Sequence, residues 1–280
     1  MIASPRACRA GAAAILAALT ACRNQAPAPL STWIEPATGM VFVYLPPGQF
    51  QMGSPAGESG RREDELLHKV SLTRGFWMGR FEVTQGEWAR VMGPGEPHPE
   101  KPSPFRQGDP RFPVVSLSYG DAQRFLARLE ALDPGYRFRL PTEAEWEYAC
   151  RAGTGSAYAT GDRLTGAEAD FDGRDPRTGQ GPWLGHPAPV GSYRPNPWGL
   201  FDLHGNAWEW TSDWYGPYPA GPVTDPAGPA AGREKVIRGG SWAFDAGNAR
   251  SACRGTHAPG DWGYSVGFRV VCDQGPAESP

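Results

Sequence analysis

The chain has 280 residues, among them 37 Gly, 30 Pro and 11 Trp, and its formal net charge is −3. This length allows one large or two small domains. The Gly and Pro content approaches that of disordered sequences, but a disordered chain has no use for so many Trp rings, which bury large areas. Charges of both signs are interspersed without a basic stripe, so nucleic acid is not an expected partner. We predict a folded, loop-rich domain.

The first segment, residues 1–21, has the features of an export signal. Arg6 and Arg9 precede an apolar run that is too short to span a bilayer. The run ends at Ala21-Cys22, and small residues before a cysteine are typical of a lipoprotein signal. We predict lipidation of Cys22, which anchors the exported protein in the cell envelope, at the outer membrane or the periplasmic face. The alternative is an ordinary signal peptide in which Cys22 stands by chance.

The rest of the chain divides into three parts. Residues 22–37 are polar and rich in Pro and Ala, and are predicted to form a tether. Residues 38–272 contain no internal repeat and no obvious linker, and are predicted to form one domain. Residues 273–280 are predicted to be a disordered tail.

Local patterns predict two strands and then three helices. Residues 40–45 are an apolar run ended by Pro and Gly, and residues 68–72 alternate like a half-buried strand. Helices are predicted to begin after Thr84, Ser118 and Thr142, because each is followed three residues later by an acid, as in a capping box. Each cap contributes about 1 kcal/mol, so these acids are expected to be structural.

The periodic patterns end after the third helix. Residues 152–238 contain Gly, Pro and aromatic residues with few periodic runs. A loop region of this length in a compact domain needs something to hold it. A metal ion, a disulfide or buried Trp side chains could do so.

Six blocks of sequence follow one another in a specific order. They are Phe81-Glu82-Val83-Thr84, Phe112-Pro113-Val114-Val115-Ser116, Arg139-Leu140-Pro141-Thr142-Glu143-Ala144-Glu145-Trp146-Glu147, Asn196-Pro197-Trp198-Gly199-Leu200-Phe201-Asp202-Leu203-His204-Gly205-Asn206-Ala207-Trp208-Glu209-Trp210, Arg238-Gly239-Gly240-Ser241-Trp242 and Gly267-Phe268-Arg269-Val270-Val271. Together they resemble the formylglycine-generating enzymes and their relatives, the sulfatase-modifying-factor family. The resemblance implies an α+β fold, the formylglycine-generating-enzyme-like variant of the C-type lectin fold, with few short helices, antiparallel strands and many loops.

The block around residue 205 carries the hard oxygen ligands that Ca²⁺ prefers. Asp202 and Glu209 supply carboxylates, and Gly205 and Ala207 can supply backbone carbonyls. In the family, the positions that match these four residues bind a structural calcium ion. The alternative is a tight loop held by Trp packing alone.

The resemblance implies a possible second calcium site. Asp170 and Phe171 match one half of it. The other half falls near Pro182 and Leu184, and proline offers no side-chain ligand.

Three cysteines follow the lipidation site: Cys150, Cys253 and Cys272. An exported protein meets an oxidising compartment, so one disulfide and one unpaired thiol are expected. In the family a disulfide joins the regions of Cys150 and Cys272, although the second cysteine comes two residues earlier there. The resemblance therefore implies a Cys150–Cys272 disulfide, and the alternative is two buried reduced thiols.

The parent chemistry requires two further cysteines. Formylglycine-generating enzymes oxidise a substrate cysteine with Cu(I), a soft metal that selects thiolate ligands, held by two cysteines just after a Gly-Gly-Ser-Tyr block. The matching residues 239–252 contain no cysteine, and Cys253 is single and lies too far along. We therefore predict no copper site and no copper-dependent oxidation.

Other relatives use iron held by three histidines. The five histidines of this chain show no metal-ligand spacing and are expected to be surface or structural residues: His68, His98, His186, His204 and His257.

A candidate ligand surface remains in residues 241–267, a segment rich in small residues with interspersed aromatic and Arg side chains. Its candidate residues are Phe244, Asp245, Asn248, Arg250, Trp262 and Tyr264. The alternative is that the aromatic rings pack inward and the arginines bond to backbone carbonyls, which we expect for Trp242 and Arg269.

These features favour a monomeric, non-catalytic module that binds a protein, peptide or glycan at the cell envelope. One alternative is an oxidoreductase or protein-maturation enzyme of the same family that uses other residues, with Arg250, Asp245 and Glu209 as candidates. A second alternative is a variable protein of a diversity-generating retroelement, since such proteins resemble this fold and vary in the same final segment.

Overall fold

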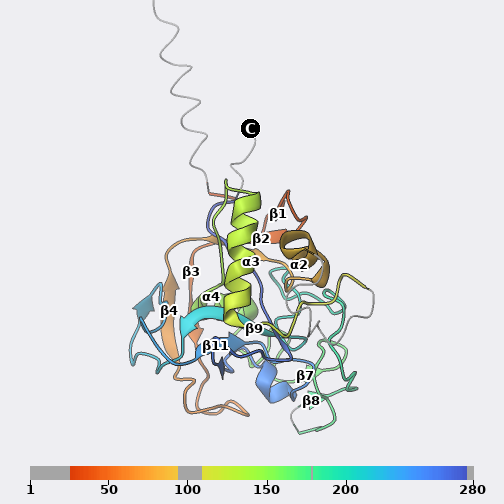
Figure 1. Cartoon of the computed structure of the whole chain (residues 1–280). Coiled ribbons are helices and arrows are strands. Elements are labelled where there is room, and N and C mark those ends of the chain that lie inside the picture. The colour runs from red at the N-terminus through yellow and green to blue at the C-terminus, as the bar shows by residue number, and fades with distance from the viewer. Residues whose placement is uncertain (1–25, 94–108, 178, 276–280) are drawn as a thin grey trace, which may run out of the picture.

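The computed structural model describes residues 26–93, 109–177 and 179–275 (Figure 1). The predicted signal peptide, the lipidation site Cys22, the histidine His98 and residues 276–280 lie outside the described residues. No helix in the described part of the chain has the length and apolar character needed to cross a bilayer.

Three α-helices begin at the predicted positions: α2 (Gln85–Met92), α3 (Tyr119–Leu132) and α4 (Glu143–Arg151). All three predicted capping boxes are present, with Thr84, Ser118 and Thr142 as N-caps. Each hydroxyl accepts a hydrogen bond from the third helical N–H, and the acid at that position bonds back to the cap N–H. The acids of these boxes are therefore structural, as predicted.

The strand predicted at residues 40–45 lies in a five-stranded sheet. This sheet contains strands from both ends of the described chain. Its order is β1 (Thr32–Ile34), β2 (Val41–Leu45), β5 (Phe76–Gly79), β14 (Val271–Cys272) and β6 (Phe138–Arg139). β1 lies inside the predicted tether, where Trp33 is buried and stacks on Phe42 at 5.1 Å between ring centroids. The domain therefore begins before residue 38. The predicted tail is also partly anchored, because Asp273 pairs with Arg139 at 2.7 Å.

Within the described residues, three smaller sheets and one short 3-10 helix accompany the five-stranded sheet and the α-helices. The four-stranded sheet has the order β12 (Gly255–His257), β11 (Lys235–Arg238), β9 (Trp208–Trp214) and β13 (Val266–Gly267). The second predicted strand, β4 (His68–Leu72), lies between β10 (Val223–Thr224) and β3 (Gly48–Met52). A two-stranded sheet pairs β7 (Leu164–Thr165) with β8 (Gly179–Gln180), and the 3-10 helix η2 spans Ala246–Ala249.

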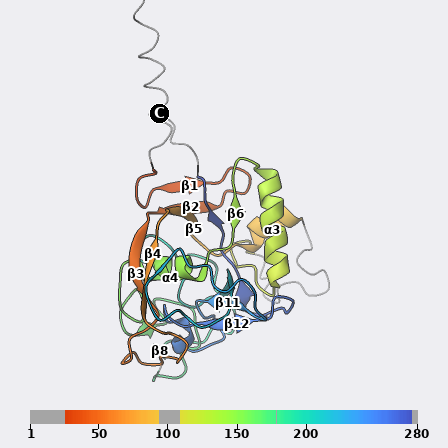
Figure 2. The same ribbon diagram turned by 90° about the vertical axis from the view of Figure 1, so that its left-hand side faces the viewer.

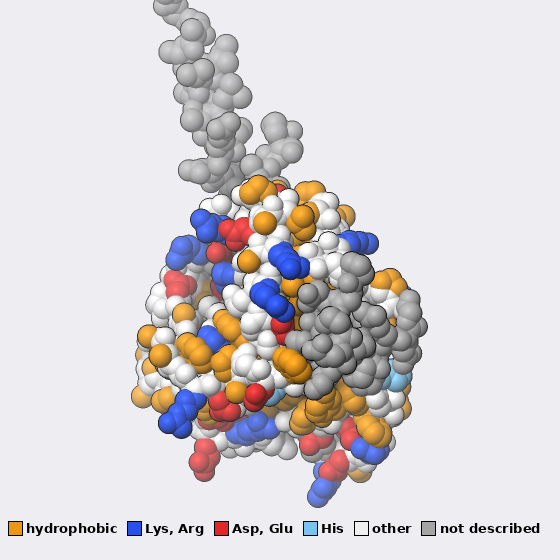
Figure 3. Space-filling model, viewed as in Figure 1, with side chains coloured by type: hydrophobic (Ala, Val, Ile, Leu, Met, Phe, Trp, Pro, Cys, Tyr) orange, Lys and Arg blue, Asp and Glu red, His pale blue; other side chains and the backbone are white. Residues whose placement is uncertain are grey.

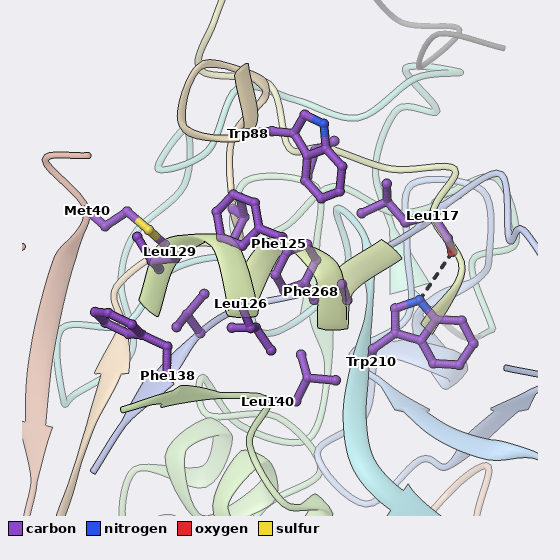
Figure 4. Packing of buried hydrophobic residues seen from close by; sticks show 14 of the residues in the cluster. Met40, Trp88, Leu117, Phe125, Leu126, Leu129, Phe138, Leu140, Trp210 and Phe268 are labelled. Atoms are coloured by element: carbon purple, nitrogen blue, oxygen red, sulfur yellow. Dashed lines mark hydrogen bonds between the residues drawn. The ribbon is translucent and has the colours of Figure 1, made fainter. Parts of the chain in front are cut away.

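The largest apolar cluster lies between α3 and the sheets (Figure 4). Phe125 of α3 stacks on Trp88 of α2 at 5.3 Å and meets Phe268 edge-on at the same distance. Trp210 of β9 donates from its indole N–H to the Leu117 carbonyl oxygen at 3.2 Å, so its polar atom is satisfied inside the core. Packing of this kind fixes α3 and β9 relative to each other.

The helices, short strands and long loops agree with the α+β fold that the resemblance implies. Figure 2, turned by 90°, shows β1 and β2 at one end of the molecule and β8 at the other. Figure 3 shows acidic, basic and apolar side chains interspersed over the face that carries α3. The loops that define the candidate site lie between the small sheets.

Candidate functional site

A pocket of about 520 Å³ lies where three loop regions meet. Its walls come from residues 55–60 between β3 and β4, from residues 155–163 after α4, and from Gly247 and Arg250 in and after η2. Gly240 packs closely against η2, since its φ is +74° and a Cβ there would lie 2.9 Å from the Ala249 amide nitrogen. The pocket therefore adjoins the segment that the sequence singled out as a ligand surface.

Arg250 lies beneath the surface instead of on it. Its side chain is almost fully buried, and its guanidinium pairs with Glu58 at 2.6 Å and with Glu65 at 2.5 Å. Burial alone would raise the pKa of Glu65, but hydrogen bonds from Arg250 and Ser54 bring the pKa below its usual value. Arg250, predicted as a ligand-surface residue, is thus buried and paired, but it still lines the pocket and fixes the loop between β3 and β4 onto residues 241–267.

Asn248 and Asp245, two of the predicted ligand-surface residues, take part in the same contact between residues 241–267 and the loop that joins β3 and β4. Asn248 accepts a hydrogen bond from the Arg62 guanidinium at 2.7 Å and donates to the Asp245 carboxylate at 3.2 Å. Arg62 also donates to the Arg254 carbonyl oxygen at 2.9 Å. These contacts hold the candidate surface in one arrangement.

The predicted aromatic residues reach the surface. Tyr264 is 53% exposed, Trp262 43% and Phe244 36%. The Phe244 and Tyr264 rings contact buried Trp rings edge-on, Phe244 against Trp208 and Tyr264 against Trp242. Trp242 is buried, as expected, and so is Arg269. The structure thus brings exposed rings and a polar pocket to one segment of the chain.

The predicted Cys150–Cys272 disulfide is absent, because Cys150, Cys253 and Cys272 are all free and buried. The Cys150 thiol lies against the Leu203 carbonyl oxygen and Ser251, whereas the Cys272 thiol donates to the Gln274 carbonyl oxygen at 3.1 Å. The two thiols therefore contact different residues. The family's second cysteine comes two residues earlier in the chain, which in a strand changes the position of the side chain along the sheet.

Cys150 also lies near His204, but the two do not form a nucleophile and base. The His204 Nδ1 donates to the Ala249 carbonyl oxygen, so Nε2 accepts from the Ala159 N–H at 2.9 Å. Burial lowers the pKa of His204 to about 4 and raises the pKa of Cys150 to about 12. A histidine with both nitrogens engaged cannot take the thiol proton, so this pair is structural.

The predicted calcium residues lie in a buried acidic cluster. Asn206 donates its N–H to the Asp170 carbonyl oxygen at 2.8 Å, and a Cβ on Gly205 would lie 2.1 Å from that oxygen. The predicted first calcium site, at residues 202–209, is therefore packed directly against Asp170, which belongs to one half of the possible second site. Burial raises the pKa of Asp170 to about 7 and that of Asp202 to about 6.

Sequence reasoning missed one member of this cluster, Glu82. Its carboxylate accepts from the Asn206 side chain at 3.0 Å and from the Ala207 N–H at 3.1 Å. Burial, and then the charges of Asp202 and Glu209, raise the pKa of Glu82 well above its usual value. An acid in an otherwise apolar and β-branched block was the signal that could have pointed to it.

The cluster fits a cation in part. Both carboxylate oxygens of Asp170 are buried without a hydrogen-bond partner, which is costly unless a proton or a cation compensates. Glu209 fits less well, because Arg269 binds both its oxygens and Trp146 donates to one of them at 2.7 Å. No group of three His, Cys, Asp or Glu side chains in the described ranges is arranged to hold a metal, so a calcium ion here needs backbone carbonyls as well.

Sequence reasoning also missed the acids that pair with the other buried arginines. On α4, Glu143 pairs with Arg254 at 2.7 Å and Glu147 pairs with Arg238 at 2.5 Å. The signal was present in the predicted helix, since these two acids are four residues apart and flank Trp146 on its buried face.

Comparisons with known proteins agree with this geometry. Residues 31–274 match the model of the FGE-sulfatase family, described as the sulfatase-modifying factor enzyme 1-like domain. The chain is 40% identical over 198 residues to the formylglycine-generating enzyme of Streptomyces coelicolor, covering 66% of this chain and 60% of that enzyme. For the enzyme of Bos taurus the identity is 34%, with 68% and 51% covered. The chain thus spans about half to three fifths of the length of these relatives.

A solved structure with a similar fold is that of PvdO from Pseudomonas aeruginosa. It aligns with a TM-score of 0.77 and 30% identity, covering 89% of this chain and all of that one. Treponema denticola variable protein 1 aligns with a TM-score of 0.72 at 24% identity, which shows the fold alone. This chain belongs to the sulfatase-modifying-factor family, and its fold is the formylglycine-generating-enzyme-like variant of the C-type lectin fold, as predicted.

Proposed function

We propose that this protein is a lipid-anchored binding module of the cell envelope that lacks the copper-dependent cysteine oxidation of its relatives. One observation carries the proposal: residues 239–252, where the resemblance places the two copper-binding cysteines, contain none. Copper(I) selects soft thiolate ligands, and the residues that follow Trp242 are Ala, Phe and Asp.

The remaining thiols do not replace the missing pair. Cys253 is fully buried, and burial raises its pKa, so it stays a protonated thiol. Arg250 and Glu209, two candidates for an alternative catalytic group, are both engaged in buried ion pairs. Neither Arg250 nor Glu209 is therefore available as a free nucleophile or base.

The pocket and the exposed aromatic rings of this segment suit a binding role. The pocket of about 520 Å³ has the size of a small-ligand site, and its walls carry charged groups from Asp162, Arg163 and Arg177. Phe244 and Tyr264 add exposed rings on residues 241–267. Polar pocket walls, together with exposed aromatic rings on the same segment of the chain, suit a peptide, a protein loop or a glycan.

Calcium is part of this proposal as a structural ion. Asp170 and Asp202, with the carbonyls of Gly205 and Ala207, would hold it, and Glu209 would join after exchanging a hydrogen bond. The ion would neutralise the excess of buried carboxylates over the single guanidinium of Arg269.

Calcium should raise the melting temperature. At saturation we expect a rise of about 5–10 °C relative to chelated protein, measured by scanning calorimetry. Asp170→Asn and Asp202→Asn should lose most of the rise, and Asp261→Asn, an exposed acid, should keep it. An unchanged melting temperature in the unsubstituted protein would contradict the calcium proposal.

Substitution of the exposed rings should weaken ligand binding. An array of envelope glycans and peptides is probed with the labelled protein and with Tyr264→Ala and Phe244→Ala, each expected to lower affinity by about tenfold or more. Leu132→Ala, an equally exposed side chain at the end of α3, is the matched control. Equal binding by all four proteins would exclude residues 241–267 as the ligand surface.

The purified protein, supplied with copper(I) and oxygen, should leave a cysteine-containing peptide unoxidised. Peptide mass and oxygen consumption are measured together, with the Streptomyces coelicolor enzyme as the positive control. Cys253→Ser should behave like the unsubstituted protein. Copper-dependent oxidation that disappears in Cys253→Ser would show that the chain is an enzyme.

Membrane attachment should depend on one cysteine. Cys22→Ala removes the thiol that the lipid would modify, so the protein should lose acyl label and leave the membrane fraction. Cys8→Ala, within the predicted signal, should leave both unchanged. Continued acylation of Cys22→Ala would refute the anchor.

A further inference from the structure

A second pocket, of about 220 Å³, shares no lining residue with the first. Two proline-containing turns form its walls, residues 216–219 and 226–229, and they touch, because a Cβ on Gly216 would lie 2.6 Å from the Pro229 ring. Proline fixes φ, so these walls are rigid before any ligand arrives. A volume of this size suits a single functional group on a short stem.

Asp213, near the end of β9, supplies the polar group of this pocket. It is 3% exposed, and its Oδ2 accepts from the Glu143 N–H at 2.9 Å and from the Ser212 hydroxyl at 3.1 Å. Its Oδ1 accepts no hydrogen bond from the described residues, and it faces the wall at Gly228, where a Cβ would lie 3.2 Å from it. The pocket thus contains a carboxylate oxygen that keeps some accessible surface and has no hydrogen-bond partner among the described residues.

No ion pair with Asp213 is present in the described chain, although the ammonium of Lys235 lies within electrostatic range of it. Arg254 binds both oxygens of Glu143, and Lys235 donates to the Ser212 carbonyl oxygen at 2.7 Å while its ammonium lies 4.0 Å from the Trp214 ring. Burial raises the pKa of Asp213 to about 7, and the charge of Glu143 raises it further in the same direction.

His68 of β4 gives the pocket a second acceptor. Its Nδ1 lies 2.8 Å from the Leu66 carbonyl oxygen, which can only accept, so Nδ1 is the donor. In the neutral ring, Nε2 then carries a lone pair. The ring also packs on Tyr218 at 4.8 Å, which fixes its orientation.

We propose that this pocket binds an organic cation, a primary ammonium or guanidinium group on a short aliphatic stem. Asp213 Oδ1 accepts from the cationic head, His68 Nε2 provides a further acceptor, and the proline walls contact the stem. Such a head comes from a free amine or from a Lys or Arg side chain of a peptide.

Binding is measured by calorimetry on the full chain. The free cations are n-butylammonium and n-butylguanidinium, and the peptide source is Nα-acetyl-lysine amide, which keeps its side-chain ammonium. Neutral n-butanol is the control probe. Both cations should bind saturably and n-butanol should not. Tighter binding of acetyl-lysine amide than of n-butylammonium identifies a peptide source, and the reverse identifies a free amine.

Two variants locate the site. Asp213→Asn keeps an oxygen for the Glu143 N–H but loses the charge, so affinity should fall at least about tenfold. Ala227→Trp places a large ring at the exposed mouth and should abolish binding, whereas Ala230→Trp, exposed on the same loop outside the pocket, should bind normally.

The pH dependence of cation binding tests whether Asp213, and not a neighbouring group, binds the cation. Affinity for n-butylammonium, which stays charged, should rise roughly tenfold between about pH 6 and about pH 8 as Asp213 ionises. The other groups that face this pocket or Asp213 are Glu143, Glu145, Lys235, His68, Tyr218 and Arg254. Asp213→Asn should abolish the rise if Asp213 causes it.

Three results would overturn the proposal: n-butanol binding as tightly as n-butylammonium, unchanged affinity in Asp213→Asn, or no saturable binding of either cation up to about 10 mM. Circular dichroism of each variant establishes that it is folded before binding is compared.

Discussion

Buried ion pairs between late arginines and earlier glutamates hold this structure together. The pairs are Arg238 with Glu143 and Glu147, Arg250 with Glu58 and Glu65, Arg254 with Glu143, and Arg269 with Glu209. Removing one partner of a buried pair costs about 3–5 kcal/mol, because the other charge remains desolvated. These pairs fix residues 238–269 onto α4, β9 and the loop between β3 and β4.

The same pairs bear on function. Arg250 and Glu209 would be candidates for catalysis if they were free, but each is bound to a partner in the framework. The large hydrophobic side chains that remain exposed in residues 241–267 are Phe244, Trp262 and Tyr264. The segment thus combines a fixed backbone with aromatic groups at its surface, an arrangement that favours recognition.

Sequence reasoning succeeded where the determining contacts are local. The caps at Thr84, Ser118 and Thr142 depend on residues three positions apart, so the helix starts could be predicted. Arg250 and Glu65 are 185 residues apart, and no local pattern pairs them. The disulfide prediction relied on the family's positions, and a shift of two residues was enough to place the Cys272 thiol elsewhere. Glu82 was overlooked because its partners come from a block far along the chain.

The position of β1 in the five-stranded sheet determines in which direction the pocket would face. β1 and β8 lie at opposite ends of the molecule, and Gly179 of β8 packs against Ala246 of η2, beside the three-loop pocket (Figures 1 and 2). If Cys22 is lipidated as proposed, a chain that enters through β1 would direct the pocket away from the bilayer. The ten residues from Cys22 to Ser31 extend at most about 35 Å. The length of this tether, more than the intrinsic affinity of the pocket for a ligand, would determine which envelope components the pocket can meet at high local concentration.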